Sequence, residues 1–260
     1  MRTMDNDEES QSATQGHLFD PRTITMRKAD PVASIANAAS AYTGGKWSSE
    51  GLDNTMAKGP EGFTVYKMHE RNMTEPPTPD TIKSYEMMRE HLGRQFDHLT
   101  APVSEGGAGI NVEVVSDNPY ETFEGMHNDV MENNRLKILS TRSTAPPETP
   151  DKGHSFFTNE ENDKFRAVHD AYGHLAIGRN FDRHGEEAAY QSHRQMFPEG
   201  AHAALASETR GQNSYLNWGG EDFPPNVMVN TPNWATKKKI KPPQPKRDMT
   251  PQSEPQGFDL

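Results

Sequence analysis

The sequence predicts a small, predominantly helical α+β domain with long extended arms at both ends. Hydrophobic residues make up only 32% of the 260 residues, too few to build one core from the whole chain. They cluster between residues 82 and 218, whereas Gly, Pro, polar and charged residues dominate the two ends. We therefore expect an extended or disordered N-terminal arm at residues 1–78, a domain at 79–220 and a Pro/Lys-rich C-terminal tail at 221–260.

The first half of the expected domain combines a long helix with two short strands. From Asp80, the expected N-cap, apolar residues recur every three or four positions and indicate an amphipathic helix: Ile82, Tyr85, Met88, Leu92, Phe96 and Leu99. The alternating, β-branched stretch 110–115 predicts a strand, and 135–140 predicts a second one. A short helix with Phe123, Met126 and Val130 on one side should lie between them.

Three helices are expected in the second half of the domain. Thr158 and Glu161 have the spacing of a capping box, which predicts a helix that runs to about Leu175. The stretch 181–197 predicts a second helix, which ends at Pro198. A third helix is expected at 201–218, where Ala, Ser and Gly residues allow neighbouring helices to approach closely.

Charge and cysteine content restrict the class of protein. The formal net charge of −11 argues against a body that binds nucleic acid generally, because phosphate binding needs concentrated positive charge. The basic stretch 236–247 is the exception, and it is either a solvated tail or a docking peptide for an acidic or nucleic-acid partner. The absence of cysteine excludes disulfides and thiolate metal sites.

The chain carries no sequence signal for export or for the membrane. Its first residues lack the apolar core of a signal peptide, and no stretch is apolar over a membrane-spanning length. We therefore expect a protein that is not secreted by a signal peptide and has no membrane partner. It should stay in the cytoplasm or in a particle, such as a virion, that is assembled there.

The stretch HDAYGH places His169 and His174 five residues apart. On an ideal helix, residues at this spacing point about 140° apart, so both can face one metal ion only if the helix is interrupted between them. Gly173 lies there, and we expect the helix to unwind at this glycine. Zinc proteases use a four-residue spacing, which this pair does not match. A metal site and a structural network of histidines are the two interpretations.

This motif resembles the metal motif of the pterin-dependent aromatic amino acid hydroxylases. In that family His, an acidic residue, two further residues, Gly and His provide two iron ligands, and a glutamate downstream on a later helix is the third. The resemblance covers residues 165–212 and implies that His169, His174 and Glu208 bind Fe2+. Such a set of two histidines and one carboxylate leaves positions on iron open for oxygen activation.

The same resemblance extends to other acidic residues but not to the substrate. Asp170 has the place of the acidic residue after the first ligand, and Glu186 and Glu187 resemble the family's downstream glutamate. We regard these three carboxylates as candidate catalytic groups. The stretch KFRAV replaces the family's proline-rich approach to the first histidine, and the expected domain is smaller than the family's catalytic domain. Neither a pterin nor the amino-acid substrate is therefore implied.

The residues themselves leave alternatives open for the ligands and for the metal. Glu186 or Glu187, together with His193 on the same helix, is a competing source of ligands. Gln212 and Arg210 are candidates to orient the carboxylate ligand, and a salt bridge to a nearby acid is the alternative for Arg210. Zn2+ is the alternative to Fe2+.

Two functions of different classes follow from these patterns. The first is a metal-dependent enzyme that performs hydroxylation or hydrolysis. The second is a structural virion or assembly protein whose arms bind other proteins of a larger shell and whose histidines are structural. The order of motifs is similar to that of uncharacterised proteins encoded near the structural genes of tailed bacteriophages. Because a virion can carry an enzyme, we expect a virion-associated accessory protein that carries a His-His-Glu metal site.

Overall fold

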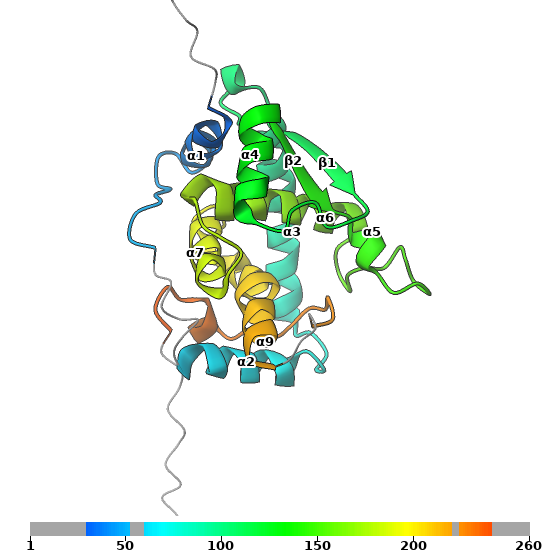
Figure 1. Cartoon of the computed structure of the whole chain (residues 1–260). Helices are drawn as coiled ribbons and strands as arrows, with labels where there is room; N and C mark the ends of the chain where they lie inside the picture. Colours follow the sequence, from blue (N-terminus) through cyan, green and yellow to red (C-terminus); the bar gives the residue numbers. More distant parts are fainter. Residues whose placement is uncertain (1–29, 53–59, 220–223, 241–260) are drawn as a thin grey trace, which may run out of the picture.

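The computed structural model describes residues 30–52, 60–219 and 224–240, and these residues form a predominantly helical α+β fold (Figure 1). The longest helix, α3, runs through the middle of the molecule, with a two-stranded sheet toward one end and α2 and α9 at the other. The α-helices and strands are α1 (Pro31–Tyr42), α2 (Pro60–Asn72), α3 (Pro79–Thr100), β1 (Asn111–Val115), α4 (Phe123–Asn133), β2 (Arg135–Leu139), α5 (Thr141–Thr144), α6 (Asn159–His169), α7 (Arg183–Arg194), α8 (His202–Ala206) and α9 (Gln212–Gly219).

Helix α3 forms where the apolar periodicity predicts it, and its buried face is the centre of the core. Tyr85, Met88, Leu92 and Leu99 are at most 2% exposed, and the helix packs against α6 and α8. The expected N-cap is wrong by two residues. Thr78 caps the helix, with its side chain accepting a hydrogen bond from the Thr81 backbone. Pro follows the cap at the first helical position, where its missing N–H costs no hydrogen bond.

The two predicted strands form a parallel pair joined by α4. Asn111 pairs with Arg135 and Val115 with Leu139, so the connection is a short βαβ unit. Leu136 and Ile138 of β2 are buried, whereas β1 keeps Val114 half exposed. The sheet therefore contributes one strand to the core and leaves the other at the surface.

The expected N-terminal arm contains two packed helices. Ile35 of α1 is fully buried in the main core, and Val65 of α2 is buried in a smaller apolar cluster. Asp30 caps α1 and Pro31 follows it. This N-terminal signal of a helix is independent of the clustering of apolar residues from which the boundary was predicted. The domain boundary expected at residue 79 is therefore wrong, because the folded body begins by residue 31. Residues 1–29 of the expected arm lie outside the described residues.

The C-terminal boundary also needs correction. Val229, Ala235 and Ile240 are buried, and the last two belong to the same small cluster as Val65. The side chain of Arg210 donates to the carbonyl of Ala235 and so fixes this segment to the body. The folded part therefore extends beyond residue 220. Of the basic stretch 236–247, only residues 236–240 are described.

The helices expected at 159–175 and 201–218 are interrupted. The first consists of α6, a π turn η4 (Asp170–His174) and a 3-10 turn η5 (Leu175–Ile177). The second consists of a 3-10 turn η6 (Glu199–Ala201), α8, a π turn η7 (Ser207–Gly211) and α9. The start of α6 is as predicted, because Thr158 and Glu161 form both hydrogen bonds of the capping box. Single π turns inside helices often mark functional positions.

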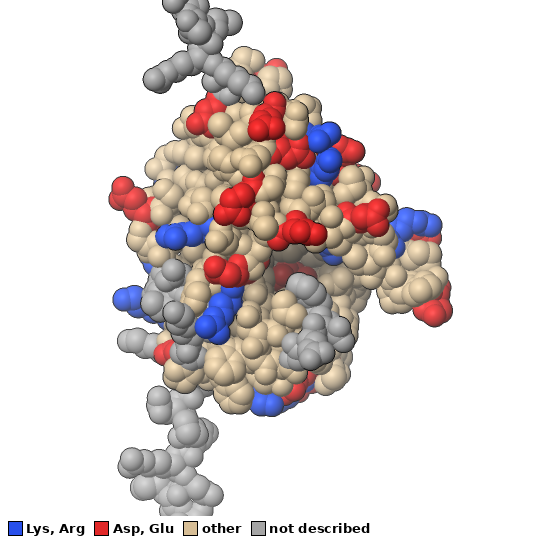
Figure 2. All heavy atoms as spheres, in the orientation of Figure 1, with Lys and Arg blue, Asp and Glu red and all other residues tan. Residues whose placement is uncertain are grey.

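Acidic side chains are spread over the upper part of the face that Figure 2 shows, with fewer basic ones among them. This distribution agrees with the net charge of −11 of the whole chain. The basic side chains on this face are scattered between acidic ones and do not form a continuous patch.

Candidate metal site

The π turn η4 brings His169 and His174 to the same side of the chain. In a π turn the backbone bonds join residues five apart, so two side chains at this spacing lie one above the other. The two imidazole rings are perpendicular to each other, with centroids 5.1 Å apart. The helix was expected to unwind at Gly173, and this is wrong: the helix widens there into a π turn. The helical chain ends only after the following 3-10 turn, at Gly178, which has a φ of 61°.

Glu186 completes a group of three ligand atoms, which we call the histidine–glutamate site. Its Oε2 lies 3.6 Å from Nε2 of His169, and its Oε1 lies 3.5 Å from Nε2 of His174. Each of the three residues offers one ligand atom, and these atoms lie within 4.8 Å of one another. Among the described residues, these three form the group of histidine and acidic side chains that could hold a metal ion. The sequence favoured Glu208 as the third ligand, and Glu186 was the competing candidate.

The start of α7 holds Glu186 in place. Asp182 caps the helix by accepting hydrogen bonds from the backbone of His184 and Gly185. Gly185 packs directly on the Asn180 carbonyl, and a Cβ at this position would lie 1.7 Å from that oxygen. Glu186 follows in the first turn, and α7 packs against η4. The carboxylate therefore comes from a rigid element.

A backbone carbonyl fixes the tautomer of His174. Nδ1 of His174 lies 3.0 Å from the carbonyl oxygen of Arg179, which can only accept a hydrogen bond. Nδ1 therefore carries the proton, and in the neutral ring Nε2 presents a lone pair toward Glu186. A lone pair and a carboxylate oxygen 3.5 Å apart repel each other unless a cation or a proton lies between them.

The titratable groups of the site shift one another's pKa values. Burial alone would raise the pKa of Glu186, but His174 and His169 outweigh this effect and hold that pKa well below its usual value. Burial alone would lower the pKa of His174, and the Glu186 and Asp170 carboxylates raise it above its usual value. Burial raises the pKa of Asp170. The pocket thus attracts positive charge, either as a proton or as a metal ion.

Gly173 lets the ring of His169 lie against the π turn. A Cβ at Gly173 would lie 3.2 Å from both Nδ1 of His169 and the Cβ of Ala189. Nδ1 of His169 is buried and has no hydrogen-bond partner among the described residues. The ring is therefore positioned by packing against Gly173 and Phe165, whose ring centroid is 5.8 Å away.

The histidine–glutamate site lies at the edge of the body and is partly open. The side chains of His169 and Glu186 are 12% and 20% exposed, whereas that of His174 is 1% exposed. Phe181, 36% exposed, packs edge-on against His174 with ring centroids 5.0 Å apart. Glu186 also lines a small cavity of about 20 Å³, which has room for about one water molecule.

Glu208, expected from the resemblance as the third ligand, belongs to a different buried cluster. Its carboxylate accepts hydrogen bonds from the Tyr85 hydroxyl and from Nε2 of Gln212, the latter at 2.8 Å. Nε2 of His154 lies 3.3 Å from Oε1 of Glu208. The physical reason is the interruption of the expected third helix, since the π turn η7 directs Glu208 toward α3. Gln212 orients this carboxylate, as expected, but at a different site from the histidines.

Tyr85 donates a hydrogen bond to Glu208, and the ring of His154 faces the same carboxylate. Nδ1 of His154 accepts from the backbone N–H groups of Phe156 and Phe157, so the neutral ring carries its proton on Nε2, facing Glu208. Burial and the Glu208 charge raise the pKa of Tyr85 well above its usual value, so its hydroxyl stays protonated. The sequence carries no signal for His154 or for this role of Tyr85, because nothing in their spacing relates them to Glu208.

The remaining candidate residues have structural contacts. Glu187 forms a buried ion pair with Arg210. Arg210 therefore makes the salt bridge to a nearby acid that was its alternative role, and it does not orient the carboxylate of the metal site. His193 makes a 2.7 Å hydrogen bond between its Nε2 and Gln95, and its ring centroid is 5.7 Å from that of His169. Burial and the two site histidines lower the pKa of His193 well below its usual value, so His193 packs as a neutral neighbour of the site.

Comparison of the chain with models of protein families, with curated proteins and with solved structures finds no match. Across the part of the chain that the structure describes, no helix has both the length and the apolar composition needed to cross a membrane. Function is therefore inferred from the geometry of the histidine–glutamate site.

Proposed function

We propose that this protein is a metalloprotein that binds one divalent transition metal through Nε2 of His169, Nε2 of His174 and the carboxylate of Glu186. The observation that carries the proposal is the convergence of these three ligand atoms within 4.8 Å. The Arg179 carbonyl supports it, because it directs the lone pair of His174 toward Glu186. A metal ion would remove the repulsion between that lone pair and the carboxylate.

The donor set decides which metals fit. Two imidazoles and one carboxylate suit Fe2+ and Zn2+, and the lack of cysteine excludes a thiolate ligand. We propose Fe2+, in keeping with the resemblance to the hydroxylase motif, with Zn2+ as the alternative. Bound iron would supply oxygen activation, and bound zinc would supply an activated water. No pterin is part of the proposal.

The position of the site favours catalysis over a closed structural metal site. Structural metal sites use all their coordination positions for protein ligands, whereas catalytic sites keep some open. Three protein ligands leave positions free, and the partial exposure of His169 and Glu186 gives access to them. Phe181 provides an apolar surface beside His174. We therefore propose a metal-dependent enzyme, hydroxylase-like with iron or hydrolase-like with zinc.

Elemental analysis of protein purified without chelator or histidine tag tests the proposal. We expect about one iron or zinc per chain in the wild type and its loss in His169→Ala and Glu186→Gln. The matched control is Glu208→Gln, a substitution of the same kind at a carboxylate outside the site. This variant should keep its metal.

Two outcomes would overturn the proposal. A wild-type protein that neither contains nor takes up Fe2+ or Zn2+ would leave a protonated His174 as the partner of Glu186, which is a structural role. Loss of metal in Glu208→Gln but not in Glu186→Gln would place the metal at the Glu208 cluster.

The role in a bacteriophage particle stays a second proposal. It depends on partner binding by the arms, and residues 1–29 and 241–260 lie outside the described residues. Co-sedimentation of the full chain with assembled particles, compared with a chain lacking residues 1–29, tests it. Equal binding by both chains would contradict a role for the N-terminal arm.

A further inference from the structure

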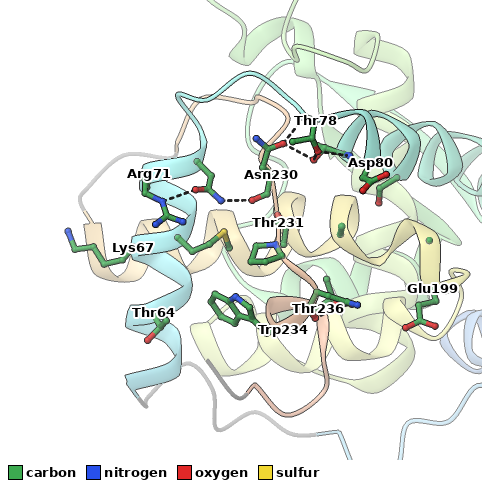
Figure 3. A pocket seen from close by; sticks show the side chains of 18 residues that line it. Thr64, Lys67, Arg71, Thr78, Asp80, Glu199, Asn230, Thr231, Trp234 and Thr236 are labelled. Carbon is green, nitrogen blue, oxygen red and sulfur yellow. Dashed lines mark hydrogen bonds between the residues drawn. The ribbon is translucent and has the colours of Figure 1, made fainter. Parts of the chain in front are cut away.

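A groove of about 830 Å³ lies apart from the histidine–glutamate site, and none of its lining residues belongs to that site (Figure 3). Its walls are one face of α2, the start of α3, the turn η6 and the segment 230–236. The volume is in the range of small-molecule sites, whereas the lining is unusually rich in hydroxyl and amide side chains. The groove therefore suits a polar ligand.

One asparagine makes the wall of this groove rigid. The side chain of Asn230 accepts from the backbone of Thr78 at 2.9 Å and from the Thr81 hydroxyl at 2.7 Å. Its amide donates to the carbonyl of Pro76, and its own carbonyl accepts from the side chain of Asn72. These bonds join the C-terminal segment to α2 and α3 (Figure 3). The groove is consequently built before any ligand binds.

The charges in the groove cancel. Lys67 and Arg71 project from α2 on one side, and Asp80 and Glu199 lie on the other (Figure 3). Lys67 also pairs with Glu70 at 2.9 Å, and Glu199 pairs with Lys237 at 3.2 Å. A singly charged ligand would gain attraction from one wall and repulsion from the other. A neutral ligand with many donors and acceptors can use both walls.

Trp234 lies in the middle of the groove, between α2 and Thr236 (Figure 3). The indole packs on the small apolar cluster that includes Met68, so its position is fixed from behind. Among the described residues its Nε1 has no hydrogen-bond acceptor, so a ligand hydroxyl can accept a hydrogen bond from it. An aromatic face beside hydroxyl, amide and carboxylate groups matches the surface of a sugar ring, which has apolar C–H faces and polar edges.

We propose that this groove binds a short neutral oligosaccharide, with one sugar ring stacked on Trp234 and its hydroxyl groups bonded to both walls. The donors and acceptors on opposite sides supply the two kinds of hydrogen bond that sugar hydroxyls need. The cancelled charges argue against a nucleotide or another anion. This proposal does not depend on the metal site.

Isothermal titration calorimetry of the full chain with maltotriose, cellotriose and triacetylchitotriose tests the proposal. We expect saturable binding of at least one trisaccharide, weakened about tenfold or more by Trp234→Ala. Trp234→Phe keeps a ring and most of the apolar packing, so it should fold and weaken binding by a smaller factor. Trp218→Ala is the control, because Trp218 is 42% exposed and lies outside the groove.

Adenosine monophosphate and triglycine are titrated in parallel as an anion and a zwitterion. Binding of a trisaccharide that depends on Trp234 and not on Trp218 supports the proposal. Binding of either comparison ligand without any trisaccharide overturns it, as does the absence of any saturable binding. Equal trisaccharide affinity in the wild type and both Trp234 variants also overturns it, since the sugar would then bind elsewhere.

Discussion

Glu186 and Glu187 are adjacent in the sequence, yet their carboxylates contact different partners. Glu186 faces His169 and His174 at 3.6 and 3.5 Å, whereas Glu187 forms a buried ion pair with Arg210. The Glu186 side chain is 20% exposed and that of Glu187 is 2% exposed. Of these two neighbouring glutamates, the first therefore belongs to the candidate metal site and the second to a buried ion pair of the folded body.

This separation predicts opposite effects of the same substitution. Glu186→Gln should abolish metal binding and, because the Glu186 carboxylate is partly exposed, lower the free energy of unfolding of the metal-free protein less than Glu187→Gln does. Glu187→Gln should keep the metal and lower the free energy of unfolding by about 3 kcal/mol, because the buried guanidinium of Arg210 would lose its ion pair with the Glu187 carboxylate. Urea unfolding and metal analysis of both variants check this prediction. Destabilisation by Glu186→Gln alone would contradict it.

Gly173→Ala should weaken metal binding without unfolding the protein. The added Cβ would lie 3.2 Å from Nδ1 of His169 and from Ala189, so the imidazole must shift by a few tenths of an ångström. We expect metal affinity to fall by about tenfold, as for other residues that orient ligands. Competition with a chromophoric chelator measures it.

Gly93→Ala is the matched control for this substitution. Gly93 lies inside α3, and a Cβ there would meet no atom within 4 Å. The added methyl group should stabilise the helix by about 0.5–1 kcal/mol and leave metal affinity unchanged. Equal affinities in both variants would mean that Gly173 does not position His169.

Sequence patterns predicted the elements that depend on local signals. The periodicity of α3, the alternation of the two strands and the capping box of α6 each act within a few residues, and all three appear in the structure. Helix α1 was missed because its buried face is made of Ile35, Ala38 and Ala39, a weakly apolar stripe. Its burial depends on a partner surface that no local pattern reveals.

The candidate site depends on tertiary structure that spacing alone does not specify. His169 and His174 were found from HDAYGH, but the π turn that aligns them follows from the packing of η4 on α7. Glu208 was preferred by analogy of spacing, and the second π turn directs it to Tyr85 instead. Glu186, twelve residues after His174 in the sequence, is brought back by the loop that ends at the Asp182 cap.

A fragment of residues 79–220 should be markedly less stable than one of residues 30–240. The shorter fragment loses α1 and α2, and with α1 it loses Ile35, which is fully buried in the main core. Burial of one such side chain contributes about 1.5–3 kcal/mol. Thermal unfolding of both fragments by circular dichroism measures the difference. Equal melting temperatures would restore the boundary that the sequence indicated at residue 79.

His69 should make the protein less stable as the pH falls from about 6.5 to about 4. Burial lowers its pKa from 6.5 to about 4, an effect that the Glu208 charge only partly opposes. Between these pH values, His69 binds a proton in the unfolded chain but not in the folded protein, so the free energy of unfolding decreases with decreasing pH. The loss should approach about 3 kcal/mol near pH 4 and vanish above pH 7. Urea unfolding at several pH values, for the wild type and His69→Phe, isolates the contribution of His69, because other buried groups titrate equally in both. The same pH dependence in the two proteins would show that His69 is protonated in the folded state.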